Sequence, residues 1–328
     1  MVLAFSSRSG TLRRHWQNTD TEQIGAQSFF GKIWENLKLL WRYGYRSPMT
    51  TKALVRELLD NYSSLYSTLT RWDSVEELSA ALNFTSLTAQ DSASFLASHG
   101  VGDAYAYEVV ESSTRVNYGQ NLDEIHALEG LVCMSADKAK SIKGGNFQVF
   151  ENFVRESKAS IHLNTRVTTL DSKLMGKWLL SASKQANGEE STVAGEYNAV
   201  ILAAPFDSLG ISLPSSVEAA PPAPYVHLHV TLLATTSTSA NEAYFNQEPG
   251  NGVPTMILTT AQGIRNGGLA PEFNSLNYAA RISEGSDERV VKLFSAERLE
   301  DDWLVDVFGQ VGWVHRKEVA SIIYSSGK

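Results

Sequence analysis

The sequence predicts an α+β fold, in which a mostly helical first third is followed by a large mixed sheet. The 328 residues are 43% hydrophobic and 10% aromatic, which is enough apolar material for one large or two ordinary domains. Helix-spaced apolar residues dominate up to about position 143, and short alternating runs dominate after it. Helices that precede strands in this way are typical of an α+β protein with a helical cap.

The first segments show where helical periodicity begins. Residues 1–30 are polar and unpatterned, so we expect them to be irregular or disordered. From Gly31 to Tyr45 apolar residues recur at helical spacing, and we expect Gly44 and Pro48 to close that helix. A second helix is predicted from Thr51 to Tyr66.

Three more helical segments follow before the sheet region. Ser74 stands three residues before Glu77, which is the spacing of a capping box and predicts a short helix there. Residues 88–99 and 102–112 also have helical character.

Strand patterns begin after one more amphipathic helix. Asn146 is a candidate N-cap for the helix that starts with Phe147. Residues 160–170 alternate like a strand, and residues 177–183 and 189–195 predict a hairpin around Asn187-Gly188. The small apolar run 199–204 is typical of a strand buried on both faces, ended by Pro205.

The last part of the chain predicts further strands. In the run 226–234, Val226, Leu228, Val230 and Leu232 are expected to face one way. The remaining predictions are strands at 255–260, 275–282 and 290–297 and a helix at 304–314.

Composition excludes several classes of function. A net charge of −8 argues against a nucleic-acid binder, because phosphate contacts need clustered Lys and Arg. Cys133 is the single cysteine, so an internal disulfide and Cys-rich zinc sites are excluded. His227 and His229 alternate on a predicted strand without a carboxylate near them in sequence, so we expect no metal site.

Common motifs are absent as well. The sequence has no GxSxG elbow, no GxxxxGK[ST] loop and no GxGxxG turn. No apolar run reaches the ~18 residues of a membrane span, and the apolar start Met1–Phe5 is too short for a signal peptide. Asn61 and Asn83 each begin an Asn-X-Ser/Thr triplet and are candidate glycosylation sites.

Three polar or glycine-rich segments are candidates for a ligand site. Residues 115–121, followed by His126, gather side-chain donors as a small-molecule site requires, although a polar loop capping the next helix has the same composition. Residues 143–146 open a helix with two glycines, which suits either an anionic ligand or a tight turn. Residues 165–167 and 203–205 are strand ends that suit a cofactor or plain sheet core.

In this order, the segments resemble the prenylcysteine oxidase (prenylcysteine lyase) family of FAD-dependent thioether oxidases. The segments that carry the resemblance are Trp41-Arg42-Tyr43-Gly44, Arg115-Val116-Asn117-Tyr118-Gly119-Gln120, Ile125–Met134, Gly144-Gly145-Asn146, Tyr197–Pro205, Val290–Ser295 and Gly309–Arg316. The resemblance covers roughly residues 30 to 316. It implies an amine-oxidase-like FAD fold of mixed sheet and helical cap.

The resemblance implies an oxidase that cleaves the thioether of farnesyl- or geranylgeranyl-cysteine. FAD accepts a hydride from the prenyl carbon bonded to sulfur, water adds, and cysteine and a prenyl aldehyde are released, while O2 becomes H2O2. The cofactor carries the redox step, which agrees with the absence of a nucleophile motif.

The resemblance also implies roles for residues and regions. Residues 31–143 would form a helical substrate cap, residues 144–214 part of an FAD domain, and residues 215–328 a mixed-sheet substrate domain. The active-site candidates are Tyr118, Gln120, Asn121 and His126, the last as a proton acceptor. The cofactor candidates are Gly144, Gly145, Asn146, Val167, Ala203, Ala204 and Pro205.

The sequence departs from this family at both ends. Nothing before Gly31 supplies the family's strand, GxGxxG turn and helix, and the sequence stops at Lys328, where its final flavin-domain segment is expected. We therefore expect a chain truncated at both ends that lacks the N-terminal Rossmann βαβ unit. Three alternatives follow: an incomplete form of the oxidase, a flavin-free binder or isomerase of a lipophilic molecule, and an inactive fragment. The family's vacuolar, lysosomal or secretory location finds no support in a leader segment here.

Overall fold

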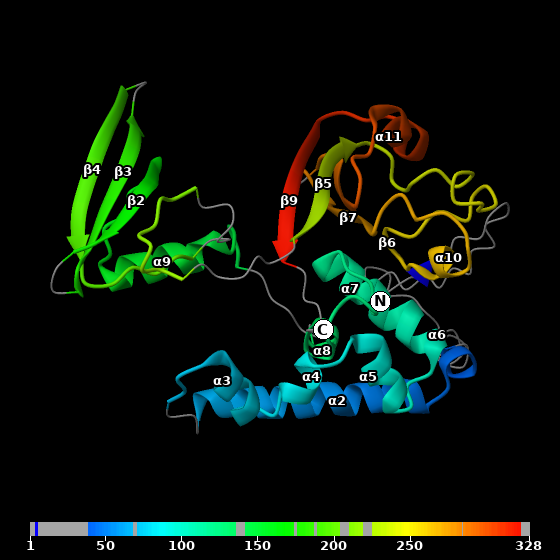
Figure 1. The fold of residues 1–328 in the computed structure, drawn as a ribbon. Helices are drawn as coiled ribbons and strands as arrows, with labels where there is room; N and C mark the ends of the chain where they lie inside the picture. Colours follow the sequence, from blue (N-terminus) through cyan, green and yellow to red (C-terminus); the bar gives the residue numbers. More distant parts are fainter. Residues whose placement is uncertain are drawn as a thin grey trace. The chain divides into compact units, whose positions relative to one another are not determined.

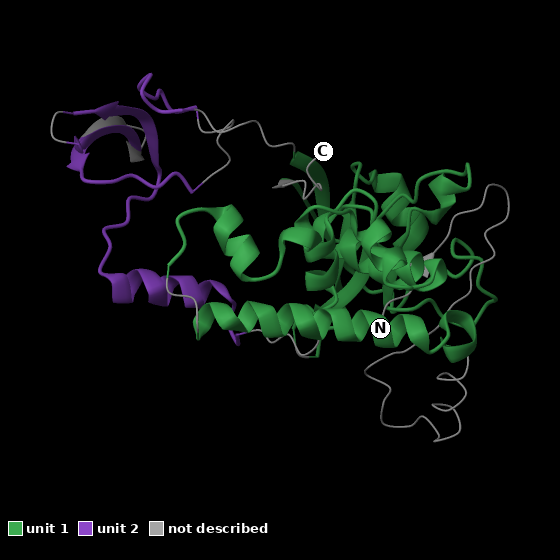
Figure 2. Cartoon of the chain, turned by 60° about the horizontal axis from the view of Figure 1, so that its bottom comes forward, with its two compact units in different colours: residues 1–137, 225–328 green, residues 138–224 purple. Residues whose placement is uncertain are grey.

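The computed structural model describes residues 4–5, 39–67, 71–135, 142–173, 176–186, 189–203, 210–218, 225–283 and 285–322. The chain forms two compact units, one of residues 1–137 with 225–328 and one of residues 138–224 (Figure 2). The first unit holds most helices and a six-stranded sheet, and the second holds one helix and a three-stranded sheet. The predicted α+β class is confirmed, whereas the functional domain boundaries remain a prediction.

Short helices gather beside one long helix in the first unit (Figure 1). They are α2 (Arg46–Ser63), α3 (Val75–Ala81), α4 (Thr85–Thr88), α5 (Ser92–Ser98), α6 (Asp103–Tyr105), a π-helical turn (Ala106–Val110), α7 (Glu111–Tyr118) and α8 (Ala127–Cys133), with a 3-10 turn at Ser64–Tyr66. Their buried apolar side chains form one core that includes Leu58, Phe84, Phe95, Leu96, Val110, Leu122 and Leu131. No helix in the described ranges is both long and apolar enough to cross a bilayer.

The start of α2 corrects one prediction. Gly44 has φ 67° and ends the helical stretch before it, as expected. Pro48, however, lies in the first turn of α2 rather than after the end of a helix. A proline at that place loses no intrahelical hydrogen bond, because the first N–H groups of a helix have no partner within it. Pro48 therefore helps to open α2.

The predicted cap at α3 is confirmed. Ser74 Oγ accepts a hydrogen bond from the N–H of Glu77 at 3.1 Å. The Glu77 carboxylate reaches back to the N–H of Asp73 at 2.9 Å, one residue earlier than in the usual capping box. Local sequence is sufficient to define the start of this helix.

A mixed six-stranded sheet completes the first unit. Its order is β1 (Ala4–Phe5), β6 (Met256–Thr259), β7 (Ser275–Arg281), β8 (Arg289–Ser295), β5 (Tyr225–Thr235) and β9 (Val314–Ile322). The β1–β6 pair is parallel and the other pairs are antiparallel. The strands predicted at 226–234, 255–260, 275–282 and 290–297 are confirmed. The short α10 (Gln262–Arg265) follows β6.

One face of this sheet carries a core. It is formed by Leu233, Ile257, Leu276, Val291 and Leu293, which pack with Leu304, Val307 and Phe308 of α11 (Asp301–Phe308). Side chains alternate along a strand, so Val226, Leu228, Val230 and Leu232 lie on the opposite face, where they are half-buried. The helix predicted to reach residue 314 ends at Phe308, because Gly309 has φ 68° and β9 starts at Val314.

The second unit contains α9 (Phe147–Ser157) and the antiparallel strands β2 (Thr165–Ser172), β3 (Trp178–Ala186) and β4 (Glu189–Tyr197). The predicted pairing of β3 with β4 is confirmed, while its turn residues Asn187 and Gly188 lie outside the described residues. Asn146 does not cap α9. Its side chain instead accepts the N–H of Ile142 at 2.9 Å, and its backbone is already helical.

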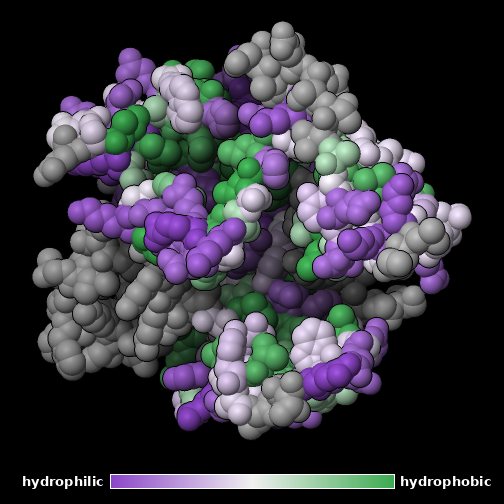
Figure 3. Space-filling model, turned by 90° about the vertical axis from the view of Figure 1, so that its left-hand side faces the viewer, coloured by the Kyte–Doolittle hydropathy of each residue, from purple (hydrophilic) through white to green (hydrophobic). Residues whose placement is uncertain are grey.

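The run 199–204 does not form the predicted buried strand in its described part. Residues 199–203 have no regular structure, and Ile201 is 89% exposed. A strand buried on both faces needs paired strands beside it and layers above and below, and the described part of this unit offers only the antiparallel sheet β2–β4. Phe147, Phe150 and Phe153 of α9 are also exposed, and hydrophobic side chains reach the surface in patches (Figure 3).

The cap at α3 gives a first prediction. Ser74→Ala removes the acceptor for the Glu77 N–H and should lower the free energy of unfolding of the first unit by about 1 kcal/mol. The measurement is urea unfolding followed by circular dichroism. Ser86→Ala, at an exposed serine in α4, is the control and should change it by less than about 0.5 kcal/mol. Equal losses in both variants would contradict the capping role.

Candidate functional site

The polar segment 115–121 lies at the end of α7 and in the turn that follows. Helix α7 continues directly from the π-helical turn Ala106–Val110, a local widening that is frequent near functional sites. Gly119 has φ 71° and ends the helix, with its N–H bonded to Arg115 O at 3.1 Å. The next residue, Gln120, is 1% exposed. The sequence-predicted residues Tyr118, Gln120 and Asn121 are thus neighbours in one tight turn.

This turn lies against the sheet. A β-carbon placed on Gly119 would lie 3.4 Å from Leu228 Cδ1 and 3.7 Å from Val226 Cγ1. Both residues belong to the half-buried face of β5. The left-handed backbone favours glycine here, and the added β-carbon would be in ordinary van der Waals contact with the strand. The polar turn therefore meets an apolar sheet face.

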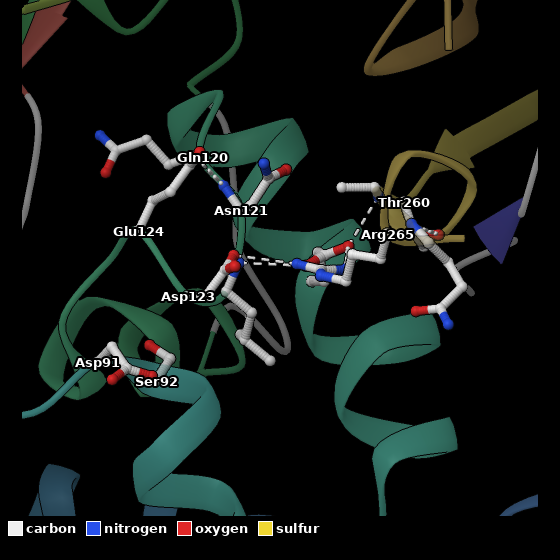
Figure 4. Close-up of polar contacts among 12 residues, drawn as sticks. Asp91, Ser92, Gln120, Asn121, Asp123, Glu124, Thr260 and Arg265 are labelled. Atoms are coloured by element: carbon white, nitrogen blue, oxygen red, sulfur yellow. Dashed lines mark hydrogen bonds and ion pairs between the residues drawn. The ribbon is translucent and has the colours of Figure 1, made fainter. Parts of the chain in front are cut away.

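A buried carboxylate fixes the other end of α7. Glu111 is fully buried, and its Oε1 accepts the N–H of Ala261 at 2.7 Å and Nη1 of Arg265 at 2.8 Å. Its Oε2 accepts the N–H of Leu122 at 3.2 Å and Nη2 of Arg265. A buried charge is stable only when such donors replace water. Arg265 also binds Asp123 Oδ1 at 3.0 Å, as Figure 4 shows.

Arg115 joins the turn to the sheet. It is 7% exposed, and its Nη1 donates to Asn121 Oδ1 at 2.6 Å. Its Nη2 donates to Asn274 Oδ1 at 2.6 Å and to Thr259 Oγ1 at 3.3 Å. Burial lowers the pKa of the Arg115 guanidinium. Asn121 is thereby held by a side chain that also grips the sheet.

Asn121 and Arg265 make further contacts that stiffen the site. The Asn121 N–H donates to Glu124 Oε2 at 2.9 Å. The Arg265 guanidinium carbon lies 4.3 Å from the centre of the Tyr107 ring, a cation–π distance, and Tyr107 belongs to the π-helical turn. The arrangement presents amide groups in a fixed orientation beside an apolar surface, which suits recognition of an amphiphilic molecule.

His126 caps the following helix. Its Nδ1 accepts the N–H of Glu129 at 3.3 Å at the start of α8. Burial lowers the pKa of His126 and outweighs the opposing effect of the Glu129 carboxylate, so the ring is neutral at pH 7. With Nδ1 engaged as an acceptor, the proton of the neutral ring lies on Nε2. The role of His126 as proton acceptor remains a prediction, and it would require release of this cap.

The cofactor candidates lie in the second unit. Gly144 and Gly145 have φ 90° and 120°, a backbone open to glycine alone, just before α9. Val167 lies in β2 at an irregularity of the β2–β3 register. Ala203 is the last described residue of the irregular stretch after β4, and Ala204 and Pro205 lie outside the described residues. The active-site candidates, in contrast, belong to the first unit.

The chain was compared with known proteins. The family model described as Prenylcysteine lyase matches residues 28–325. This chain belongs to the prenylcysteine lyase family. Farnesylcysteine lyase of Arabidopsis thaliana is 25% identical over 286 residues, which are 84% of this chain and 52% of that protein. Prenylcysteine oxidase 1 of Homo sapiens is 25% identical over 291 residues, with 83% and 56% covered.

The chain spans about half the length of these curated relatives. Among solved structures, a redesigned putrescine oxidase superposes with a TM-score of 0.48 at 10% identity, covering 85% of this chain and 66% of that one. The sequence-based assignment to the family is therefore confirmed by the family model.

The remaining candidates from the sequence are His227, Cys133, Asn83 and Asn61. His227 binds Glu318 Oε1 through Nδ1 at 2.9 Å, and no cluster of three metal-ligating side chains occurs among the described residues. Cys133 is buried, and burial raises the pKa of its thiol, which makes it a poor nucleophile at neutral pH. Asn83 is exposed in a turn with φ 57°, while Asn61 lies within α2, and glycosylation of both remains a prediction.

Sequence reasoning missed Glu111 and Arg265. They are 154 positions apart, and neither stands in a recognisable motif. The available signal was a single glutamate inside an otherwise uncharged helical stretch, Val109 to Thr114, and it says nothing about the partner.

The buried carboxylate gives a second prediction. Glu111→Ala leaves the Arg265 cation and two N–H groups without their acceptor, so the free energy of unfolding should fall by about 3–5 kcal/mol. Urea unfolding monitored by circular dichroism measures this change. Glu76→Ala, at an exposed glutamate in α3, is the control with an expected change below about 0.5 kcal/mol. A loss below about 1 kcal/mol for Glu111→Ala would argue against the clamp.

His126 gives a prediction on pH. Its folded-state pKa is lowered, so the unfolded chain binds the proton more tightly. The stability that the neutral ring contributes is present above the unfolded pKa of about 6.5 and is lost as pH falls below it. His126→Asn keeps a cap and removes the titration, so its stability should fall less than that of the unaltered chain between about pH 7 and pH 5. The measurement is urea unfolding of both proteins at the two pH values. If the free energy of unfolding falls equally in both between about pH 7 and pH 5, the prediction is wrong.

Proposed function

We propose that this chain serves the oxidative cleavage of the thioether bond in a prenylated cysteine, as an FAD-dependent oxidoreductase. The observation that supports this best is the family match over residues 28–325 together with the turn Tyr118–Asn121 set against an apolar sheet face. A prenylcysteine has a long apolar chain and a small polar head, and this site combines both kinds of surface.

The reaction is balanced as follows. A thioether R–CH2–S–Cys, O2 and water give an aldehyde R–CHO, free cysteine and H2O2. The C–S bond breaks, the carbon is oxidised by two electrons, and O2 is reduced by the same two. FAD, when bound, supplies this two-electron chemistry. The protein has to bind and orient the thioether and admit the water molecule that adds to the oxidised carbon.

The residues of the second unit fit part of an FAD site. Gly144 and Gly145 adopt backbone conformations that let the main chain approach a ligand closely, just before α9. Val167 at the β2 irregularity, and Ala203, would offer backbone contacts. The sequence contains no GxGxxG, so the described residues do not supply the turn that commonly holds a pyrophosphate. An FAD site built on these residues needs that contact from elsewhere.

In the first unit, Tyr118, Gln120 and Asn121 would orient the substrate. Asn121 is fixed by Arg115, so its amide needs little further ordering when a ligand binds. Gln120 is buried in the turn, where its hydrogen bonds face little competition from water.

The polar turn and the apolar sheet face also fit a second candidate function. A flavin-free binder or isomerase of a lipophilic, prenylated molecule would use the same turn and sheet face and would need no pyrophosphate site. An inactive fragment would bind neither ligand nor flavin. Flavin content separates the first function from both.

The location follows from the same proposal. Prenylcysteine degradation fits a vacuolar, lysosomal or secretory compartment, and the exposed Asn83 in its Asn-Phe-Thr triplet fits N-glycosylation there.

Flavin binding is the central test. The full chain, mixed with FAD and desalted, should retain an absorption band near ~450 nm, and S-farnesyl-L-cysteine should bleach it under anaerobic conditions. Oxygen should restore the band and release prenyl aldehyde and H2O2. A folded chain that binds farnesylcysteine without retaining flavin would support the flavin-free candidate instead.

The polar turn is tested by a double variant. Tyr118→Phe with Gln120→Ala removes two polar groups and should lower kcat/KM for farnesylcysteine by at least about tenfold. Tyr66→Phe with Gln90→Ala makes the same chemical changes at exposed positions and should leave kcat/KM within about twofold. Unchanged turnover in the first variant would remove these residues from the site.

A further inference from the structure

A strip of the six-stranded sheet is apolar and lies on the face opposite the α11 core. Its members are Val226, Leu228, Val230, Phe294 and Val319, which we call the apolar strip. Register places Leu228 directly opposite Val319 and Val230 directly opposite Phe294, so all share one face. Val319 is 36% exposed, and the other four are half-buried.

The strip begins at the polar turn. Val226 and Leu228 are the residues that a β-carbon on Gly119 would touch. Val230 is the next residue of β5 on this face, about 7 Å beyond Leu228 along the strand. A ligand on the strip therefore lies beside Tyr118–Asn121.

Cations flank the strip. Lys317 stands directly opposite Val230, and Lys292 stands opposite Leu232 with its Nζ 4.3 Å from the centre of the Phe294 ring. In the described parts of β5, β8 and β9, no Asp or Glu occupies a position on this face, whereas Glu318 lies on the other. The face thus combines apolar surface with positive charge in a chain of net charge −8.

We propose that the apolar strip binds the prenyl chain of an isoprenoid thioether and that Lys317 binds the carboxylate of its cysteine. This assignment rests on the proposed function and names the surface that recognises the substrate. A cysteine carboxylate at Lys317 holds its sulfur near the Gly119 turn, while the prenyl chain covers Val230 and Phe294. Charge complementarity with Lys317 favours an amphiphile that carries a carboxylate over a lipid that carries none.

Ligand chemistry and position are tested together by titration calorimetry of the full chain. The probes are S-farnesyl-L-cysteine and its methyl ester, which lacks the carboxylate. Lys317→Gln should weaken binding of the acid by about threefold and leave the ester unchanged. Glu318→Gln, the neighbouring residue on the opposite face, is the matched control and should change neither.

A second variant tests the apolar contact. Val319→Glu lies on the edge strand β9 at a partly exposed position, so circular dichroism should show a folded protein. It should weaken binding of the acid by at least about fivefold, because the apolar contact is lost and the new carboxylate lies on the same face as Lys317. Light scattering of the same samples reports whether a second copy covers the strip.

The outcomes separate this inference from the proposed function. Binding of farnesylcysteine that neither Lys317→Gln nor Val319→Glu alters would overturn the strip as the binding surface, and the function would stand. A dimer that Val319→Glu dissociates, with ligand affinity unchanged, would assign the strip to self-association. Absence of prenylcysteine binding by the unaltered chain, with and without FAD, would overturn the inference and the function together.

Discussion

The buried Glu111 carboxylate is the constraint on which the first unit depends. It is fully buried, and its two oxygens are satisfied only because Leu122, Ala261 and Arg265 bring four donors to it. Leu122 lies in the turn after α7, Ala261 directly precedes α10, and Arg265 is the last residue of α10. Burying a carboxylate costs free energy unless every such donor is in place. A shift of α7 against the sheet would separate Glu111 from these donors and destabilise the fold. The position of α7 is therefore set by charge as well as by packing.

Two more contacts connect α7 and the polar turn to the sheet. Arg115, one turn along α7, bonds to Thr259 and Asn274 of the sheet side and to Asn121 of the turn. Gly119 lies beside β5, and its left-handed backbone ends α7 there. Glu111 and Arg115 lie one turn apart in α7, and Gly119 follows its last residue. Each of the three contacts a different part of the sheet side. A turn held in this way presents its amides with little freedom left to lose on binding.

Features of the fold that depend on residues close together in sequence could be predicted from the sequence. The Ser74 cap, the β3–β4 pairing and the alternating strand β5 each depend on residues close together, and all were predicted correctly. Pro48 was misread because proline is common both after a helix and in its first turn. Residues 199–203 were misread because a buried strand exists only with partners that the sequence of the strand itself does not name. The Glu111–Arg265 pair joins positions 154 apart, which no local pattern can show.

The candidate substrate residues and the candidate cofactor residues lie in different units. The polar turn and the apolar strip belong to the first unit, whose core is complete on the α11 side and whose ion network is internal. The second unit carries the glycine pair and Val167, together with exposed apolar side chains on α9 and at Ile201. Exposing this apolar surface to water costs free energy. A bound cofactor or a covering polypeptide should therefore raise the stability of the second unit. The contacts that hold α7 and the polar turn are made within the first unit.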